Sequence, residues 1–206
     1  MLAASLGRGS GDGETTVDQS CMSRVSRMRH RSCLPLVLAL GFLLVIAGTA
    51  GAAKPPRGGQ PARIEYVIDG DTVVLTNGRH VRLVQIDTPE VYNSPECYGN
   101  QASKIMKRLL RPGTAVRLYR EPRTDAVDAY GRLLRYVFRV RDGLNVNVQL
   151  VRVGAAAPYF YHSRRGRYAR PLLGLARRAR VRHLGLWGRC PGTPWDPNHG
   201  VSTGPA

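Results

Sequence analysis

The sequence has few acidic residues. Its 206 residues include 14 Asp and Glu against 31 Lys and Arg, so the formal net charge is +17. Such an imbalance argues for a polyanionic partner, and nucleic acid is the commonest polyanion. A solvated basic surface, or attraction to anionic lipid, would also give this composition. Charge alone leaves these readings open.

One stretch lacks charge altogether. Residues 34–53 are apolar and end in small residues, which is typical of a signal peptide cleaved near Ala52 or Ala53. The run is also long enough to act as an uncleaved anchor. We therefore expect a protein that is secreted, or anchored at the outer face of the cell membrane if the leader stays. Residues 1–33 have no apolar period and are expected to be disordered or an over-extended start.

Cysteine is scarce, and no His/Cys cluster has the ligand spacing of a zinc site. Cys21 and Cys33 lie in or before the leader. Cys97 and Cys190 are the remaining pair, and export would favour their oxidation. A disulfide between them would tie the C-terminal end to the rest of the domain, but the sequence leaves their proximity open.

The remaining chain divides by composition. Residues 54–61 are rich in Pro and Gly and predict a linker, and residues 191–206 predict a flexible tail. Residues 62–190 form the expected globular domain, with no internal repeat. A hydrophobic content of 43% is enough for a core.

The periodicity of this domain predicts short strands and helices. Strands are expected at 63–68, 73–76, 80–86, 114–120 and 133–140, and helices at 100–111, 145–153 and 172–183. Asn77-Gly78 between two of these strands is a strong hairpin signal, because both turn residues must tolerate positive φ. Strands in hairpins and meanders, with one helix between the third and fourth, favour an α+β fold: a five-stranded barrel of the oligonucleotide-binding type with about three helices.

Against this basic background, four acids gather between residues 68 and 90. They are Asp69, Asp71, Asp87 and Glu90. If the predicted hairpin folds the chain back, Asp71 and Asp87 meet at its open end, where their oxygens suit a hard cation. Asp69 can equally be a residue that shapes the turn before Asp71.

Several motifs carry a family resemblance. They are Asp-Gly-Asp-Thr at 69–72, Arg-Leu-Val-Gln-Ile-Asp-Thr-Pro-Glu at 82–90, Tyr-Gly at 98–99 and Asp-Ala-Tyr-Gly-Arg at 128–132. In order and spacing this set resembles the staphylococcal nuclease (thermonuclease) family over about residues 63–187. The resemblance implies an oligonucleotide-binding barrel that hydrolyses phosphodiesters with Ca²⁺.

The resemblance also implies residue roles. The matching positions are the metal ligands Asp71, Asp87 and the Thr88 carbonyl, the general base Glu90, the phosphate-clamping Arg82 and Arg132, and the nucleotide-pocket residues Tyr130, Tyr159 and Tyr161. For Tyr159 and Tyr161, packing of the barrel against the last helix is the alternative.

The chemistry of these side chains agrees with that implication. A phosphodiester gains negative charge when water attacks it; a cation and arginine forks offset that charge, and a carboxylate can accept the proton. We therefore expect an exported, Ca²⁺-dependent nuclease, a monomer whose partner is DNA or RNA, with no protein partner implied. The alternatives are a barrel that binds nucleic acid without cutting it, and a membrane-apposed basic protein.

Overall fold

A computed structural model describes residues 57–205 of the chain. The expected disordered start and the leader, residues 1–53, lie outside the described residues. Within 57–205, no helix combines the length and apolar character needed to cross a bilayer.

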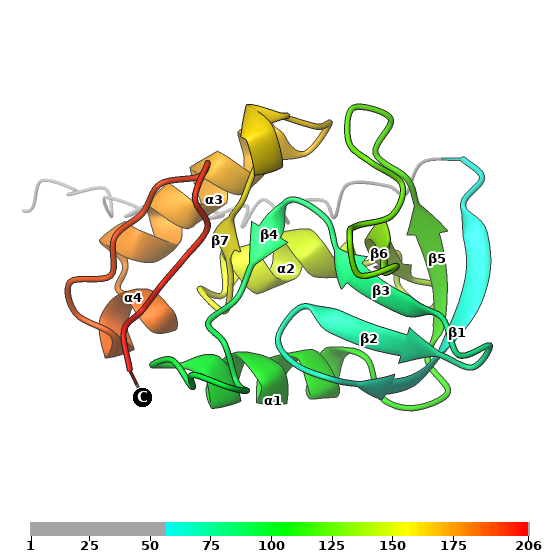
Figure 1. The fold of residues 1–206 in the computed structure, drawn as a ribbon, viewed down its shortest axis with the longest axis horizontal. Helices are drawn as coiled ribbons and strands as arrows, with labels where there is room; N and C mark the ends of the chain where they lie inside the picture. The colour runs from blue at the N-terminus through cyan, green and yellow to red at the C-terminus, as the bar shows by residue number, and fades with distance from the viewer. Residues whose placement is uncertain (1–56, 206) are drawn as a thin grey trace, which may run out of the picture. The chain divides into compact units, whose positions relative to one another are not determined.

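Five strands close into a barrel (Figure 1). They are β1 (Gln60–Val67), β2 (Thr72–Leu75), β3 (His80–Leu83), β5 (Ala115–Tyr119) and β6 (Leu133–Arg139), in the order β1-β2-β3-β6-β5. Four neighbouring pairs are antiparallel, whereas β3 and β6 run parallel. The predicted five-stranded α+β barrel is confirmed, but hairpins and meanders alone do not close it, since the β3–β6 pair is parallel.

The predicted hairpin forms between β2 and β3. Val73 lies opposite Val81 in its register. Gly78 has a φ of 76°, and its N–H donates to the Leu75 carbonyl at 2.8 Å. The turn therefore uses the positive φ that glycine adopts without steric cost.

The second strand of this hairpin is shorter than expected. The sequence predicted one strand over residues 80–86, but Gln85 has a φ of 65° and breaks it after Leu83. Chain direction changes there, and β4 (Ile86–Asp87) pairs instead with β7 (Ala157–Pro158) in a separate two-stranded sheet. Asp87 therefore lies on this small sheet and not at the end of the hairpin.

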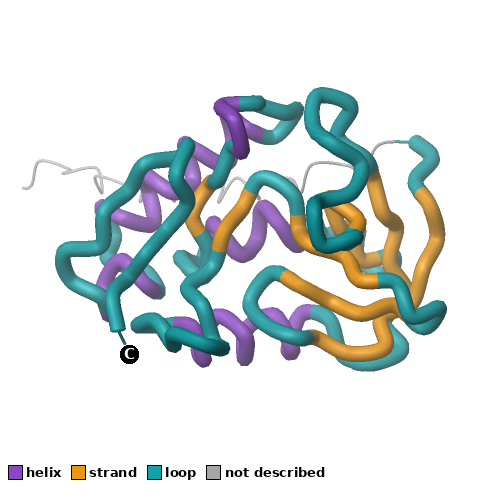
Figure 2. The backbone as a smooth tube through the Cα atoms, in the orientation of Figure 1, coloured by secondary structure: helices purple, strands orange, loops and turns teal. Residues whose placement is uncertain are grey.

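Helices cover the barrel in the order that the sequence predicted, and Figures 1 and 2 show their arrangement. The three longest are α1 (Gly99–Leu109), α2 (Val146–Arg152) and α3 (Ala169–Val181), followed by the short α4 (Leu186–Arg189). Asn145 caps α2 by accepting a hydrogen bond from Val148 N. One helical turn, η1 (Tyr161–Ser163), follows β7.

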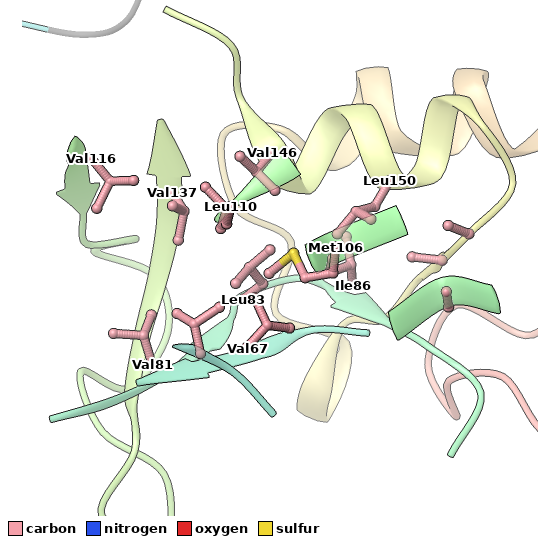
Figure 3. Close-up of a cluster of buried hydrophobic side chains, with 14 of the residues drawn as sticks. Val67, Val81, Leu83, Ile86, Met106, Leu110, Val116, Val137, Val146 and Leu150 are labelled. Atoms are coloured by element: carbon pink, nitrogen blue, oxygen red, sulfur yellow. The ribbon is translucent and has the colours of Figure 1, made fainter. Parts of the chain in front are cut away.

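One apolar cluster joins barrel and helices (Figure 3). Met106 and Leu110 from α1 and its end, Leu83 from β3 and Leu150 from α2 are all almost fully buried in it. Burying each such side chain contributes about 1.5–3 kcal/mol. The helix predicted at 100–111 thus packs its Met106 face against the barrel core.

The C-terminal segment differs from the flexible tail expected for residues 191–206. The structure contains a disulfide between Cys97 and Cys190, the pairing that the sequence left open. Beyond it, Trp195 packs on Trp187, and the Thr203 hydroxyl donates to the Cys97 carbonyl at 2.7 Å. Residues 191–205 thereby return along the loop before α1 and toward β4.

Candidate functional site

The Asp-Gly-Asp-Thr motif forms a tight turn between β1 and β2. One oxygen of Asp69 accepts hydrogen bonds from the backbone N–H groups of Asp71 and Thr72, at 2.9 and 2.7 Å. A Cβ on Gly70 would lie 2.5 Å from the Thr88 hydroxyl, so only glycine allows this approach. Asp69 therefore shapes the turn, and Gly70 lets the 88 region lie against it.

The turn directs the Asp71 carboxylate inward. Its Oδ2 accepts hydrogen bonds from Thr88 N and Thr88 Oγ1, at 3.1 and 3.0 Å, and its Oδ1 accepts one from the Thr72 hydroxyl. Asp71 is only 4% exposed. The two motifs are thus joined through one carboxylate, by contacts between Asp71 and Thr88, 17 residues apart.

Arg82 bridges the two predicted metal-binding aspartates. Its Nη1 lies 2.5 Å from Asp71 Oδ2, and its Nη2 lies 2.7 Å from Asp87 Oδ1. Nη1 also donates to the Ile86 carbonyl at 3.1 Å. The structure therefore brings Asp71, Arg82 and Asp87 together, although Asp87 arrives there from β4.

This grouping concentrates negative charge. Burial raises the pKa of Asp71; Arg82 and the Thr88 hydrogen bond oppose the rise, while the nearby charges of Asp69 and Asp87 add to it. Burial acts to lower the pKa of Arg82, but the aspartates raise it above its usual value. One guanidinium thus sits among several carboxylates, an arrangement that a cation would stabilise.

Glu90 lies at the edge of the same group. Partial burial raises the pKa of its carboxyl, and the charges of Asp87 and Asp69 raise it further. Its backbone is held by Glu96, whose carboxylate accepts from Glu90 N at 3.0 Å. A Cβ on Gly99 would lie 2.2 Å from the Glu90 carbonyl oxygen, so the Tyr-Gly motif permits the close contact that holds this loop.

Arg132 is presented by a loop organised around Asp128. Asp128 Oδ1 accepts from the backbone N–H groups of Tyr130 and Arg132, at 3.0 and 2.9 Å, and Oδ2 accepts from Arg132 Nε at 2.6 Å. Burial acts to raise the pKa of Asp128, but these bonds lower it below its usual value. Asp128 is therefore the residue that orients Arg132.

Arg82 and Arg132 line a common pocket of about 520 Å³. Its lining includes Arg82, Arg132 and the three predicted tyrosines, Tyr130, Tyr159 and Tyr161. Tyr130 is 84% exposed and lies against the Arg132 guanidinium, 5.2 Å from ring centroid to Cζ. The Tyr159 and Tyr161 rings are 6.3 Å apart. All three tyrosines thus line the same pocket.

Two contacts of the site had no signal in the sequence. Val201 N donates to Asp87 Oδ2 at 2.9 Å, so the C-terminal segment touches a predicted metal ligand. Gln85, which breaks the strand, donates from its amide to the Arg164 carbonyl at 2.9 Å and accepts from the Tyr136 hydroxyl at 2.9 Å. Val201 lies outside the motifs, and Gln85 is an uncharged position within the 82–90 motif, so only the folded chain reveals these contacts.

The donor set suits a hard cation. Within residues 57–205, no group of three or more His, Cys, Asp or Glu side chains is arranged to hold a metal. The candidates are thus the paired carboxylates of Asp71 and Asp87, with Thr88 bonded to the first, and further oxygens would have to come from elsewhere. Calcium accepts such irregular oxygen shells.

Comparison with known proteins identifies the family. Residues 80–189 match the family described as staphylococcal nuclease homologue. The chain belongs to that family. The resemblance based on the motifs is confirmed, and so is the prediction of a nuclease-type enzyme at the level of the family.

Individual relatives agree with this placement. An uncharacterized endonuclease of Escherichia coli O157:H7 is 36% identical over 138 residues, covering 65% of this chain and 81% of the relative. The thermonuclease of Staphylococcus intermedius is 34% identical over 139 residues, covering 64% and 78%. Endonuclease YhcR of Bacillus subtilis is 35% identical over 109 residues, 47% of this chain, which spans only 9% of that longer protein.

Proposed function

We propose that the protein is an exported, Ca²⁺-dependent nuclease that hydrolyses phosphodiester bonds of DNA, RNA or both. The observation that carries the proposal is the bridge from Asp71 through Arg82 to Asp87, in which Arg82 also lines a pocket together with Arg132 and tyrosines. A non-catalytic nucleic-acid-binding barrel would have no need to place two carboxylates beside one arginine, since acids repel phosphate.

Asp71, Asp87 and Thr88 are the residues that would hold the cation. When bound, Ca²⁺ would act as a Lewis acid for a phosphate oxygen and would orient the attacking water. Burial and the charges of Asp69 and Asp87 raise the pKa of Asp71, so a bound cation would favour the ionised carboxylate that metal binding needs.

The two arginines supply donors for the phosphate. A guanidinium has five N–H donors, and Arg82 directs three of its hydrogen-bond contacts to Asp71, Asp87 and the Ile86 carbonyl. Arg132 is held by Asp128 through Nε, and within residues 57–205 its Nη groups make no hydrogen bond, so they can donate to a phosphate. Such forks strengthen as charge grows on the equatorial oxygens, so they favour the transition state over bound substrate.

Glu90 is the proposed general base. Within residues 57–205 its carboxylate has no hydrogen-bond partner, whereas its backbone is fixed by Glu96. A carboxylate with no hydrogen-bond partner, on a fixed backbone and with its pKa raised by its surroundings, is suited to accept a proton from water.

Tyr130, Tyr159 and Tyr161 offer ring faces and hydroxyls to a nucleotide.

Export rests on two features. The apolar run at 34–53 is typical of a leader, and the Cys97–Cys190 disulfide is typical of proteins outside the cytoplasm. The N-terminal residue of the protein recovered from its host tests this part of the proposal. A start close to Lys54, in protein recovered outside the cytoplasm, is expected; a cytoplasmic protein with an intact leader would contradict it.

The nuclease itself is tested by incubating the protein with DNA and with RNA, in Ca²⁺ or in chelator. Cleavage is expected in Ca²⁺ and not in chelator. Glu90→Gln should lower kcat by about 10²–10⁴-fold, because a general base is lost. Arg82→Ala should lower it by about 10²–10³-fold, because a donor to the developing charge is lost.

The matched control is Glu65→Gln, which removes an exposed acid from β1, away from the pocket. It should leave kcat unchanged. Cleavage at the wild-type rate by Glu90→Gln and Arg82→Ala would refute the assigned roles. Tight binding of DNA or RNA with no cleavage under any metal would favour the binding barrel instead.

A further inference from the structure

A second concave site lies between α2 and α3. This groove has a volume of about 590 Å³. Its rim carries four exposed arginines, Arg152, Arg167, Arg170 and Arg178, and its apolar lining includes the half-buried Val148 and Leu175. None of the residues that line the groove is Asp or Glu. We call this site the arginine groove.

The arginines on α3 are not spread evenly around the helix. Arg170 and Arg178 are eight residues apart, so they lie close to one face and both border the groove. Arg177 and Arg180 are on the same helix and exposed, but they do not line the groove. Arg170 also lies in the first turn of α3, where a positive charge is unfavourable beside the helix dipole. A negatively charged ligand would offset that cost.

The arginine groove is linked to the active-site pocket by a short basic segment, Arg164-Arg165-Gly166-Arg167. Arg164 lines the pocket and Arg167 lines the groove. Three residues of chain span at most about 11 Å, so the two sites are neighbours.

Buried polar side chains hold this segment through hydrogen bonds to its backbone. The Glu121 carboxylate, 2% exposed, accepts from Arg167 N at 2.8 Å, and the Gln85 amide donates to the Arg164 carbonyl. A Cβ on Gly166 would lie 2.5 Å from Glu121, so the segment lies directly on that carboxylate. The path between pocket and groove is therefore held in place by the barrel.

We propose that the arginine groove binds the phosphate backbone of the single-stranded nucleic acid that extends from the active-site pocket past Arg164 and Arg167. The inference rests on the proposed nuclease function and extends it to substrate length. Apolar side chains between arginines suit a single strand, whose bases pack on apolar surface while its phosphates meet guanidinium groups. Continuity with the pocket favours nucleic acid over an acidic peptide or a lipid surface.

The test is binding of a labelled single-stranded oligonucleotide of about 20 nucleotides, a length that exceeds one barrel site. Fluorescence anisotropy is measured in chelator, so cleavage plays no part. The groove variant is Arg170→Gln/Arg178→Gln, and the matched control is Arg177→Gln/Arg180→Gln, which loses the same charge from the same helix. All four side chains are exposed, so both variants should fold.

The expected difference is in the salt dependence. Each lost phosphate contact to a single strand lowers the slope of log affinity against log salt by about 0.7, so the groove variant should lose about 1.4. Wild type should therefore weaken about sevenfold more than the groove variant when salt rises fourfold. The control should keep the wild-type slope. With an oligonucleotide of about four nucleotides, too short to extend far beyond the pocket, all three proteins should be equal.

Equal slopes for the groove variant and its control would overturn the proposal, because the arginines of α3 would then contribute to binding only through their total charge and not through their position in the groove. Unchanged oligonucleotide binding with selective loss of binding to anionic phospholipid vesicles would also overturn it, in favour of a membrane surface. The binding result is independent of catalysis. If the groove variant has a smaller salt slope but the wild-type protein cleaves no substrate, the nuclease proposal fails and the binding role of the arginine groove stands. If the protein cleaves but the slopes are unchanged, only the proposal for the arginine groove fails.

Discussion

Arg82 holds two carboxylates with one side chain, and the site geometry depends on that bridge. Its contacts with Asp71 and Asp87 connect β3, the turn before β2 and β4. Lysine could not replace it, because an ammonium group has no planar fork to span two acceptors. Arg82 is thus both a structural link and the proposed phosphate donor, so its loss affects geometry as well as charge.

Asp128 offers a cleaner test, because it acts through Arg132. Asp128→Ala removes the acceptors for Tyr130 N, Arg132 N and Arg132 Nε, and kcat/KM should fall about a hundredfold as Arg132 loses its position. Asp128→Asn keeps an oxygen for the backbone N–H groups, so its loss should be smaller. Steady-state kinetics on one substrate measures both.

The unequal effect of the two variants is the diagnostic result. If Asp128→Asn and Asp128→Ala were both indistinguishable from wild type, Arg132 would not need this support.

Asp128 should also stabilise the fold in a defined pH window. Because its folded pKa lies below the ordinary 3.8, its contribution is present above that value and is lost as pH falls through the lower folded pKa.

At the scale of single residues, the sequence pointed to the charged residues of the motifs but not to the uncharged residues that shape the site. Of the motif residues, Arg82 and Arg132 line one pocket, and Asp71 and Asp87 are both ion-paired with Arg82. Gln85 was not foreseeable, since an amide inside an apolar run looks like any strand residue, and its positive φ appears only in the folded chain.

At the scale of elements, the C-terminal segment is the largest departure from expectation. Gly and Pro in residues 191–206 predicted a flexible tail, yet Val201 N donates to Asp87 Oδ2 and Ser202 donates to Glu96. Glu96 in turn holds the backbone of Glu90. The segment therefore supports two predicted functional residues, through contacts whose partners lie more than 100 residues earlier in the chain.

Gly200 allows a direct test of this support. A Cβ there would lie 2.5 Å from Asp87 Oδ2, so Gly200→Ala should push the segment away from Asp87. Loss of an outer-shell hydrogen bond to a metal ligand typically costs about 10- to 100-fold in metal affinity. The Ca²⁺ concentration that gives half-maximal cleavage should rise by a factor in that range.

Gly204→Ala is the matched control. Gly204 has a φ of 75°, close to the 80° of Gly200, but a Cβ there meets no atom within 4 Å. Both variants carry the same backbone strain, and only Gly200→Ala touches the site. Equal Ca²⁺ requirements in the two variants would mean that the segment does not position Asp87.

The strands show that local sequence patterns predict hairpins but not pairings between distant segments. Alternation and Asn77-Gly78 predicted the β2–β3 hairpin correctly, because its signals are local. The break at Gln85 and the β4–β7 pairing depend on residues about 70 positions apart, Asp87 and Ala157 among them, and short strands of two residues carry no periodicity. The parallel β3–β6 closure is likewise a property of the whole barrel.

At the scale of the whole molecule, one covalent link joins the start of α1 to the end of α4. Cys97 and Cys190 are separated by 93 residues, so in the chain-entropy model their disulfide contributes about 4–5 kcal/mol to the free energy of unfolding. Reduction, or Cys97→Ser/Cys190→Ser, should lower the free energy of unfolding measured in denaturant by about that amount.

The control is reductant added to the Cys97→Ser/Cys190→Ser protein, since residues 54–206 contain no other cysteine. Reductant should leave the free energy of unfolding of this variant unchanged. A wild-type protein whose denaturation midpoint is insensitive to reductant would show that the disulfide adds nothing to folding.

The charge of the molecule also becomes interpretable at this scale. The excess of Lys and Arg predicted a polyanionic partner without saying where it binds. The folded chain gathers part of that charge in the pocket with Arg82, Arg132 and Arg164, and part in the arginine groove. Acids are concentrated where the proposed cation would lie, which explains their clustering in a basic protein.

The central claim is that Asp71 and Asp87 together seat a cation, and calorimetric titration with Ca²⁺ tests it most directly. The wild-type protein should bind one Ca²⁺. Asp87→Asn, which keeps the shape of the side chain but removes its charge, should weaken binding about a hundredfold or more, while Glu65→Gln should bind like wild type. Equal Ca²⁺ affinity in wild type and Asp87→Asn would contradict the account.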